Sequence, residues 1–319
     1  MTDAKTFDTA SSADSLLREG ESNYGVTSGK KKKHYKLRPA KKLNRSPVVT
    51  FFLFLGVAAL GAFMVLPVVF AFVNAFKPME ELFIFPPRLW VANPTTENFI
   101  NLAQILSNLW VPFSRYLFNS TFVSVVATVG NVLVASMCAY PLAKHRFPGQ
   151  KGISEIIVVA LLFTGQVLYI PQYIIIAKLG LINTYPALIL PVIQQTLGVF
   201  LMRQFMTQVP TSLLEAARID GGNEFFIWWR VVMPAVRPAW LTLTIFAFQA
   251  IWNQPGNNFI YDEAMKVLPA VMSQVQAGGL ARAGVVSAIA LVMLLPPVIL
   301  FQLTQKSVIE TMTASGIKE

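Results

Sequence analysis

The sequence has 319 residues, of which 54% are hydrophobic and only 13% are charged, and its formal net charge is +10. This length would allow two soluble domains, but six long stretches without Asp, Glu, Lys or Arg argue against a soluble protein. About 20 helical residues cross a bilayer core, so we predict an all-α integral membrane protein with six transmembrane helices. The predicted spans are Val48–Val73, Tyr116–Ala143, Ile156–Ala177, Leu179–Met202, Pro238–Tyr261 and Ala283–Gln305.

Residues 1–47 differ from the rest of the chain. Residues 1–29 are polar and predicted to be disordered, and Lys30–Arg45 then carries nine Lys or Arg residues. A nucleic-acid arm is conceivable, but a basic run beside a membrane span more often contacts anionic lipid. We therefore expect a disordered basic cytoplasmic tail, no nucleic-acid partner, and a first span that is an uncleaved anchor.

The six-helix domain is predicted to cover residues 48–305, followed by a short cytoplasmic tail, 306–319. The third and fourth spans are separated only by Lys178 and a turn with Gly180, Asn183 and Pro186, which indicates a tight hairpin. The single cysteine, Cys138, lies inside the second span and cannot form an intrachain disulfide.

The basic residues predict the orientation of the chain. If both termini are cytoplasmic, 20 of the 26 Lys and Arg residues lie inside and 6 lie outside. This follows the positive-inside rule, so the segment 203–237 should face the cytoplasm and the segment Asn74–Arg115 should face outside.

The spans contain uncharged polar side chains rather than charges. Such residues mostly form hydrogen bonds between membrane helices, but they would also suit a cavity for a neutral polyhydroxyl solute. Both interpretations stay open. The candidates for a substrate pathway are Gln166, Tyr169, Gln172, Gln194, Gln195, Gln249, Trp252 and Asn253.

The sequence lacks a phosphate-binding G-x-x-x-x-G-K-[ST] loop and the common dinucleotide, zinc-protease and C-x-x-C motifs. No Asp, Glu, Lys or Arg lies in the middle of a span, which counts against a proton-driven carrier or a voltage sensor. We therefore predict a non-enzymatic chain with no catalytic residue, no metal site and no cofactor of its own.

One charged segment, residues 210–234, lies between two apolar stretches. Ser212 followed by Glu215 fits a capping box and predicts a helix that begins at Ser212. Gly221 suits the left-handed position that ends such a helix.

A second short helix should follow, over Glu224–Val232. Asn223 is a suitable N-cap residue, and Pro234 should end this helix before the next span begins. Apolar residues on both short helices are expected to face the bundle, lipid or a partner protein.

This segment resembles the EAA loop of ABC importer permeases. The matching residues are Glu215-Ala216-Ala217, Gly221 and Val231-Val232-Met233-Pro234, with Val231 and Met233 in place of the usual Ile and Leu. Further segments resemble the carbohydrate-uptake branch, in particular the maltose-type second permease. They are Phe118–Ser120, Ala139–Ala143, Arg146–Gly149, Leu179–Thr184, Phe200–Phe205, Trp252-Asn253 and Ser315–Lys318.

The resemblance covers about residues 48–319 and implies a type I ABC importer permease in a bacterial cytoplasmic membrane. It implies a second homologous permease subunit, two ATPase subunits that bind ATP and Mg, an extracytoplasmic solute-binding protein, and a sugar as solute. The loop 210–234 would be a pair of cytoplasmic coupling helices in a cleft of the ATPase. The residues implied in coupling are Glu215, Ala216, Ala217, Arg218, Asp220, Gly221, Phe226 and Pro234.

Two alternatives remain. One is a permease of the same class for another solute, such as glycerol phosphate, polyamine or peptide, although the uncharged spans favour a neutral solute. The other is a self-sufficient channel or secondary carrier. The sequence does not name the sugar.

Overall fold

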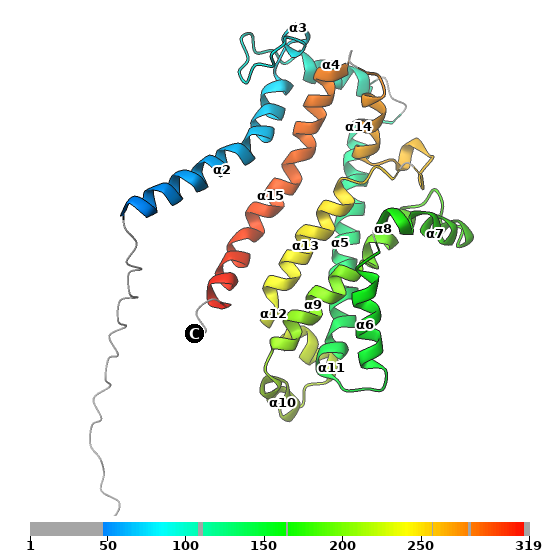
Figure 1. Cartoon of the computed structure of the whole chain (residues 1–319). Coiled ribbons are helices and arrows are strands. Elements are labelled where there is room, and N and C mark those ends of the chain that lie inside the picture. The colour runs from blue at the N-terminus through cyan, green and yellow to red at the C-terminus, as the bar shows by residue number, and fades with distance from the viewer. Residues whose placement is uncertain (1–46, 108–110, 164, 257, 280–281, 316–319) are drawn as a thin grey trace, which may run out of the picture. The chain divides into compact units, whose positions relative to one another are not determined.

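The computed structural model describes residues 47–107, 111–163, 165–256, 258–279 and 282–315 (Figure 1). Apart from residue 47, the predicted basic tail lies outside this part. The chain divides into two units, residues 1–61 and 62–319, and the division falls within the first described helix. Everything described below as a site belongs to the second unit.

The described residues form helices and no strands. In chain order these are α2 (Pro47–Ala75), α3 (Met79–Leu82), α4 (Glu97–Ser107), α5 (Phe113–Lys144), α6 (Gln150–Ala160), α7 (Gly165–Lys178), α8 (Tyr185–Ile193), α9 (Thr196–Gln208), α10 (Thr211–Ile219), α11 (Glu224–Phe226), the π-helix η1 (Ile227–Val232), α12 (Met233–Ala235), α13 (Arg237–Trp252), the 3₁₀ turn η2 (Glu263–Met265), α14 (Leu268–Gln276) and α15 (Ala283–Ser315).

The predicted all-α membrane fold is confirmed. Four described segments are long and apolar enough to cross a membrane, namely Val48–Ala75, Phe113–Lys144, Tyr185–Gln208 and Ala283–Gln305. Two bent helix pairs, α6 with α7 and Glu224–Ala235 with α13, raise the count to six if each pair is one span. The six predicted spans match this higher count. Helix α15 continues beyond the predicted end at Gln305 to Ser315.

The third span is not the continuous helix that hydropathy predicts. The chain bends by 109° between α6 and α7, so residues 150–178 form a broken pair. Leu161–Phe163 at the bend are as apolar as the helices around them. Hydropathy reports burial in lipid and is insensitive to such a bend, which is why the sequence prediction was wrong here.

The fourth span begins later than predicted, at Tyr185 instead of Leu179. The predicted turn is present, with Gly180 and Asn183 both at positive φ, 66° and 63°. Thr184 precedes the helix and Pro186 lies in its first turn, where a missing N–H costs nothing. Residues 179–184 therefore belong to the turn.

The fifth span ends at Trp252, nine residues before its predicted end at Tyr261. Pro255 and Gly256, the latter with φ 66°, follow the helix and turn the chain. Phe259 and Ile260 are nonetheless buried, because this loop packs back on the bundle. Their apolar character made an irregular segment look like a continuation of the span.

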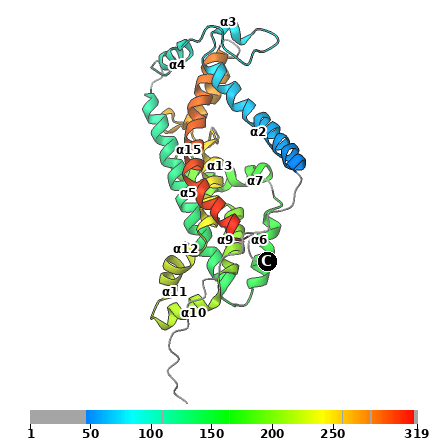
Figure 2. The ribbon, with the colours of Figure 1, turned by 90° about the vertical axis from the view of Figure 1, so that its left-hand side faces the viewer.

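Helix α5 is the centre of the second unit. It packs against α8, α9 and α13, and α13 also packs against α15 (Figures 1 and 2). In both views α10 and α11 lie at one end of this bundle, and α3 and α4 lie at the other. The loop 210–234 is therefore separated by the length of α5 from the segment that was predicted to face outside.

Side chains near the N-terminal end of α5 hold the loop that precedes α14. Tyr116 Oη donates to Glu263 Oε1 at 2.8 Å, and the Asn119 amide donates to the carbonyls of Ala264 and Lys266, both at 2.9 Å. Burial raises the pKa of Glu263, but the hydrogen bonds from Lys266 and Tyr116 outweigh it and hold that pKa below its ordinary value. The carboxylate of Glu263 therefore stays ionised and accepts the hydrogen bonds from Tyr116 and Lys266.

Candidate functional site

The first short helix of the loop 210–234 begins differently from the prediction. Helix α10 starts at Thr211, one residue before the predicted Ser212, and the preceding Pro210 provides no side-chain cap. The predicted capping box is therefore wrong. Ser212 lies within the first turn rather than before it, so its hydroxyl does not occupy the position from which it could cap Glu215.

The end of α10 confirms the predicted role of Gly221. Gly222 N donates to Ala217 O at 2.9 Å and Gly221 N donates to Arg218 O at 3.0 Å, which is the Schellman pattern around the C-cap residue Asp220. Gly221 has φ 84°. A Cβ atom at Gly222 would lie 2.8 Å from Ala217 O, so this second glycine is required by space rather than by φ.

The second short helix begins as predicted and ends later. Asn223 Oδ1 accepts a hydrogen bond from Phe226 N at 2.8 Å and caps α11. The helical path then continues through η1 and α12, so the predicted break at Pro234 is wrong. Pro234 lies at the start of α12, where its missing N–H is tolerated, and the chain turns by 83° after Ala235.

Glu224 joins three elements, a role that its position in the sequence does not indicate. Tyr140 Oη on α5 donates to Glu224 Oε2 at 2.7 Å. Arg218 Nη2 on α10 lies 2.9 Å from Glu224 Oε1, and His145 Nε2, just after α5, lies 3.2 Å from Oε2. Glu224 therefore connects both short helices to the end of α5. The sequence signal was weak, because Tyr140 and His145 are about 80 residues away.

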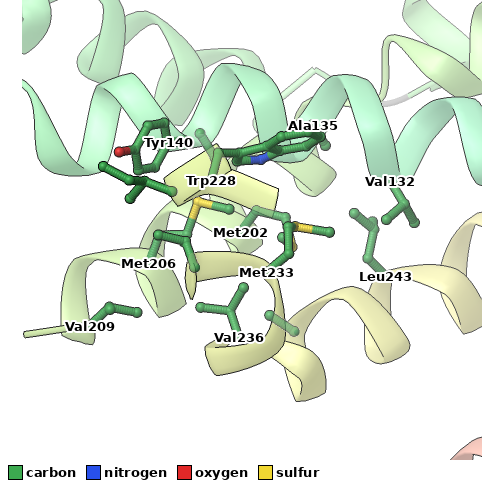
Figure 3. Close-up of a cluster of buried hydrophobic side chains, with 14 of the residues drawn as sticks. Val132, Ala135, Tyr140, Met202, Met206, Val209, Trp228, Met233, Val236 and Leu243 are labelled. Carbon is green, nitrogen blue, oxygen red and sulfur yellow. The ribbon is translucent and has the colours of Figure 1, made fainter. Parts of the chain in front are cut away.

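Buried side chains also anchor the loop. Ile227, Trp228 and Val232 on η1 are buried in one cluster with Tyr140 and Met206. Figure 3 shows Trp228 between Tyr140 and Ala135 of α5, with Met202 and Met206 of α9 beneath it. A π-helix is rare and often marks a functional segment. Here it places consecutive residues of the loop into the bundle.

The opposite side of the loop is exposed. Ile219 at the end of α10 is 87% exposed, and Leu213, Phe225, Phe226 and Trp229 are exposed large apolar side chains of the same segment. Of the other residues implied in coupling, Glu215, Ala216, Arg218, Asp220, Gly221 and Pro234 are also exposed, while Ala217 is half-buried. The loop thus leaves both apolar and charged groups exposed.

Five of the eight predicted pathway residues line a single open cavity of about 920 Å³. Gln166, Tyr169 and Gln172 come from α7, and Gln194 and Gln195 come from the break between α8 and α9. The lining also includes Gln254, Thr196 and apolar side chains, and among the described residues it contains no Asp, Glu, Lys, Arg or His. Amide and phenol groups can donate hydrogen bonds to hydroxyl groups and accept from them, and an aromatic ring can pack on a sugar face.

The other three predicted pathway residues do not line this cavity. Trp252 is buried against α15, and its Nε1 donates to Met293 O at 2.9 Å. The Asn253 amide donates to the carbonyl of Gln249 at 3.0 Å, and both residues are exposed at the end of α13. Gln254, one residue further on, is the one that reaches the cavity. Among the described residues, no group of three His, Cys, Asp or Glu could hold a metal ion.

No family model matches the chain. Curated relatives do. The chain is 29% identical over 289 residues to an arabinooligosaccharides transport system permease protein of Halalkalibacterium halodurans, covering 87% of this chain and 99% of that protein. It is 31% identical over 204 residues to the sn-glycerol-3-phosphate transport system permease protein of Yersinia enterocolitica, covering 61% and 70%. It is 32% identical over 225 residues to protein LplC of Bacillus subtilis, covering 70% and 73%.

The chain belongs to the family of ABC-type, binding-protein-dependent sugar importer permeases. Its fold agrees with this assignment. The permease matches a chain of a bacterial ABC transporter involved in the import of the acidic polysaccharide alginate, with a TM-score of 0.68 and 22% identity, over 82% of this chain and 98% of that one. The EAA-like segment and the uncharged cavity are therefore features of a transport permease.

Proposed function

We propose that the permease is the membrane-spanning subunit of an ATP-driven importer for a neutral oligosaccharide. The observation that carries this proposal is the uncharged, amide-lined cavity in a chain of this family. A phosphate or uronate group would lose its water inside the membrane without meeting a cation on this lining, which is costly. Related permeases are named for neutral solutes, arabinooligosaccharides and diacetylchitobiose, and also for anionic ones, sn-glycerol-3-phosphate and polygalacturonan/rhamnogalacturonan. The uncharged lining, and not these names, is therefore what favours a neutral solute.

The loop 210–234 is the proposed contact with the ATPase. Its exposed apolar side chains, Leu213, Ile219 and Phe225, need a partner surface, since apolar groups of this size on one protruding segment are typical of interfaces. Its inner side is fixed to α5 through Glu224 and Trp228. A displacement of the exposed side by the ATPase would therefore be transmitted to α5 through these contacts. ATP and Mg would be bound by the partner.

The full assembly would contain a second homologous permease, two ATPase subunits and an extracytoplasmic binding protein. A solved bacterial alginate ABC transporter is in complex with an alginate pentasaccharide-bound periplasmic protein, and its chain matches this one with a TM-score of 0.54 and 14% identity. That complex supports a binding-protein-dependent importer. We place the binding protein at the end of the bundle opposite the loop 210–234, because that end was predicted to face outside. The permease would lie in a bacterial cytoplasmic membrane with both termini inside.

The docking role predicts a strong effect of Ile219→Asp. A carboxylate in an apolar contact is costly to desolvate, so we expect the ATPase to be lost from the purified complex and ATP-driven uptake to fall by about tenfold or more. Ile100→Asp is the matched control, because Ile100 is an exposed isoleucine on α4 at the opposite end. Retention of the ATPase and normal uptake by Ile219→Asp would contradict the docking surface.

The orientation is tested by thiol labelling in intact cells, with Cys138→Ser to remove the native thiol. Asn93→Cys should react with a membrane-impermeant maleimide, and Ile219→Cys should react only after the cells are opened. Ile219 is suitable because it is almost fully exposed, whereas a side chain at Gly222 would contact Ala217 O. The reverse labelling pattern would contradict the proposed topology.

The cavity residues give a further prediction. Gln172→Leu and Gln195→Leu should each lower oligosaccharide uptake by about tenfold, because a buried sugar hydroxyl that loses its partner costs about 1–3 kcal/mol. Protein level should not change. Gln204→Leu is the control, since Gln204 is an exposed glutamine on α9 that is not part of the lining. Uptake by both cavity variants at the level of the parent would show that these amides do not contact solute.

A further inference from the structure

A buried side chain of α5 reaches the break between α8 and α9. Asn131 is fully buried, and its Nδ2 donates to the carbonyl of Val192 at 2.7 Å and to that of Ile193 at 3.2 Å. These are the carbonyls of the last two residues of α8, which the regular hydrogen bonds of the helix do not reach, although the N–H of the C-cap residue Gln194 also donates to Val192 O. In a membrane no water replaces the missing donor, so a side-chain amide is a substantial stabilising contact.

The carbonyl of Val192 also accepts a hydrogen bond from the backbone of Gln195. Gln195 N donates to Val192 O at 3.2 Å, so Val192 O accepts both the backbone of Gln195 and the side chain of Asn131. Gln194 and Gln195 are the two residues between the helices, and both line the cavity. Asn131 itself is not part of the lining. It therefore lies behind the break while the two glutamines lie on the cavity side.

Two glycines allow this close approach. A Cβ atom at Gly130 would lie 2.7 Å from Ile193 Cδ1, and one at Gly198 would lie 3.1 Å from Ala135 Cβ and 3.2 Å from Asn131 Oδ1. Both distances at Gly198 are shorter than ordinary van der Waals contacts of a Cβ atom. The distance at Gly130 is shorter than Cβ atoms in proteins essentially ever show. The glycines therefore bring the backbone between α8 and α9 within hydrogen-bond reach of α5.

We propose that Asn131 is a positioning residue for solute passage. It fixes the end of α8, and through Val192 O it fixes the direction in which Gln194 and Gln195 present their amides to a neutral oligosaccharide. This inference rests on the proposed function of the cavity as the solute pathway. It adds a residue that touches no solute and acts only through the geometry of the break.

The chain offers a matched control in Asn119. Asn119 also lies on α5, is fully buried, and donates two hydrogen bonds to backbone carbonyls, those of Ala264 and Lys266. These two carbonyls belong to the loop before α14, and Asn119 Oδ1 also accepts a hydrogen bond from Tyr185 Oη at the start of α8, at 2.8 Å. None of these three partner residues is part of the cavity lining. Replacement of either asparagine removes the same chemical group from the same helix. Only Asn131 should act through Gln195.

The test combines Asn131→Ala, Gln195→Leu and their double variant in the complete reconstituted importer, with Asn119→Ala alone and combined with Gln195→Leu. Uptake is measured with the member of a panel of neutral arabino-, malto- and xylo-oligosaccharides that the parent transports best. We expect Asn131→Ala and Gln195→Leu each to lower uptake by about tenfold, and the double variant to be no worse than Gln195→Leu. By contrast, the effects of Asn119→Ala and Gln195→Leu on uptake should multiply in their double variant.

The outcomes separate this inference from the proposed function. If the effects of Asn131→Ala and Gln195→Leu multiply as those of Asn119→Ala do, the positioning role is wrong and the pathway stands. If Gln195→Leu transports like the parent, the pathway itself is wrong, and the positioning role is wrong with it.

A second readout does not depend on the sugar. In the Cys138→Ser background, the thiol of Gln194→Cys should change its rate of maleimide labelling when Asn131→Ala is added, and not when Asn119→Ala is added. Asn131→Ser replaces Asn131→Ala if the latter does not insert. An unchanged labelling rate in the Asn131 variant would overturn the inference.

Discussion

Gly221→Val should abolish ATP-driven uptake while the permease still inserts into the membrane. Gly221 has φ 84°, and this left-handed conformation costs a residue with a side chain about 1–2 kcal/mol, more when it is β-branched. A Cβ atom there would meet nothing within 4 Å, so the backbone conformation is the whole obstacle. The strained turn should extend or redirect α10 and displace its exposed face from the ATPase.

The measurements are uptake in vesicles and recovery of the ATPase with the purified permease. Gly221→Asn should retain much of both, because asparagine tolerates the left-handed region. Gly152→Val is the matched control, since Gly152 lies in α6 without a positive φ and with open space around its Cβ position. Normal uptake and full ATPase recovery with Gly221→Val would show that this turn does not couple the loop to the ATPase.

Glu224→Ala should separate docking from transport. It removes the acceptor of Tyr140 and the partner of Arg218 and His145, so the short helices lose their polar connection to α5. The exposed ion pairs contribute about 0–1 kcal/mol each, whereas the hydrogen bond from Tyr140 to a carboxylate contributes about 1.5–3 kcal/mol. We therefore expect uptake to fall by about tenfold with the ATPase still bound, because Leu213, Ile219 and Phe225 remain in place.

The decisive measurement is the amount of solute taken up per ATP hydrolysed. Tyr140→Phe removes only the hydroxyl and should reproduce most of the loss, and the double variant should be no worse than Glu224→Ala. Glu155→Ala, which removes an exposed carboxylate on α6, should leave this ratio unchanged. If Glu224→Ala lowers uptake and ATPase binding in the same proportion, Glu224 supports docking and does not transmit movement to α5.

The sequence predicted those features that depend on local chemistry. Long uncharged stretches give membrane helices because the backbone must satisfy its own hydrogen bonds in lipid. The positive φ of Gly221 and the cap at Asn223 followed from the residue types at the end and start of short helices. Five of the predicted pathway residues line one cavity, and they were selected because they are polar side chains in uncharged spans.

The bends of the spans were decided by tertiary structure. The break between α6 and α7, the late start of the fourth span and the loop after Trp252 all occur in sequence without charged residues. Hydropathy measures the preference for an apolar environment, and Phe259 satisfies that preference in a packed loop as well as in a helix. The predicted capping box at Ser212 was wrong because α10 begins one residue earlier, at Thr211, so that Ser212 lies inside the helix.

The contacts that join distant parts of the chain were also decided only by folding. Tyr140 reaches Glu224 and Asn131 reaches Val192 because α5 packs against segments that follow it by 60 to 85 residues. Nothing in the local sequence of α5 specifies these partners. Sequence therefore determined which polar, apolar and charged groups the permease has available for its proposed contacts with solute and partner. Packing around α5 determined which of these groups act together, because a hydrogen bond depends on distances that only the folded bundle sets.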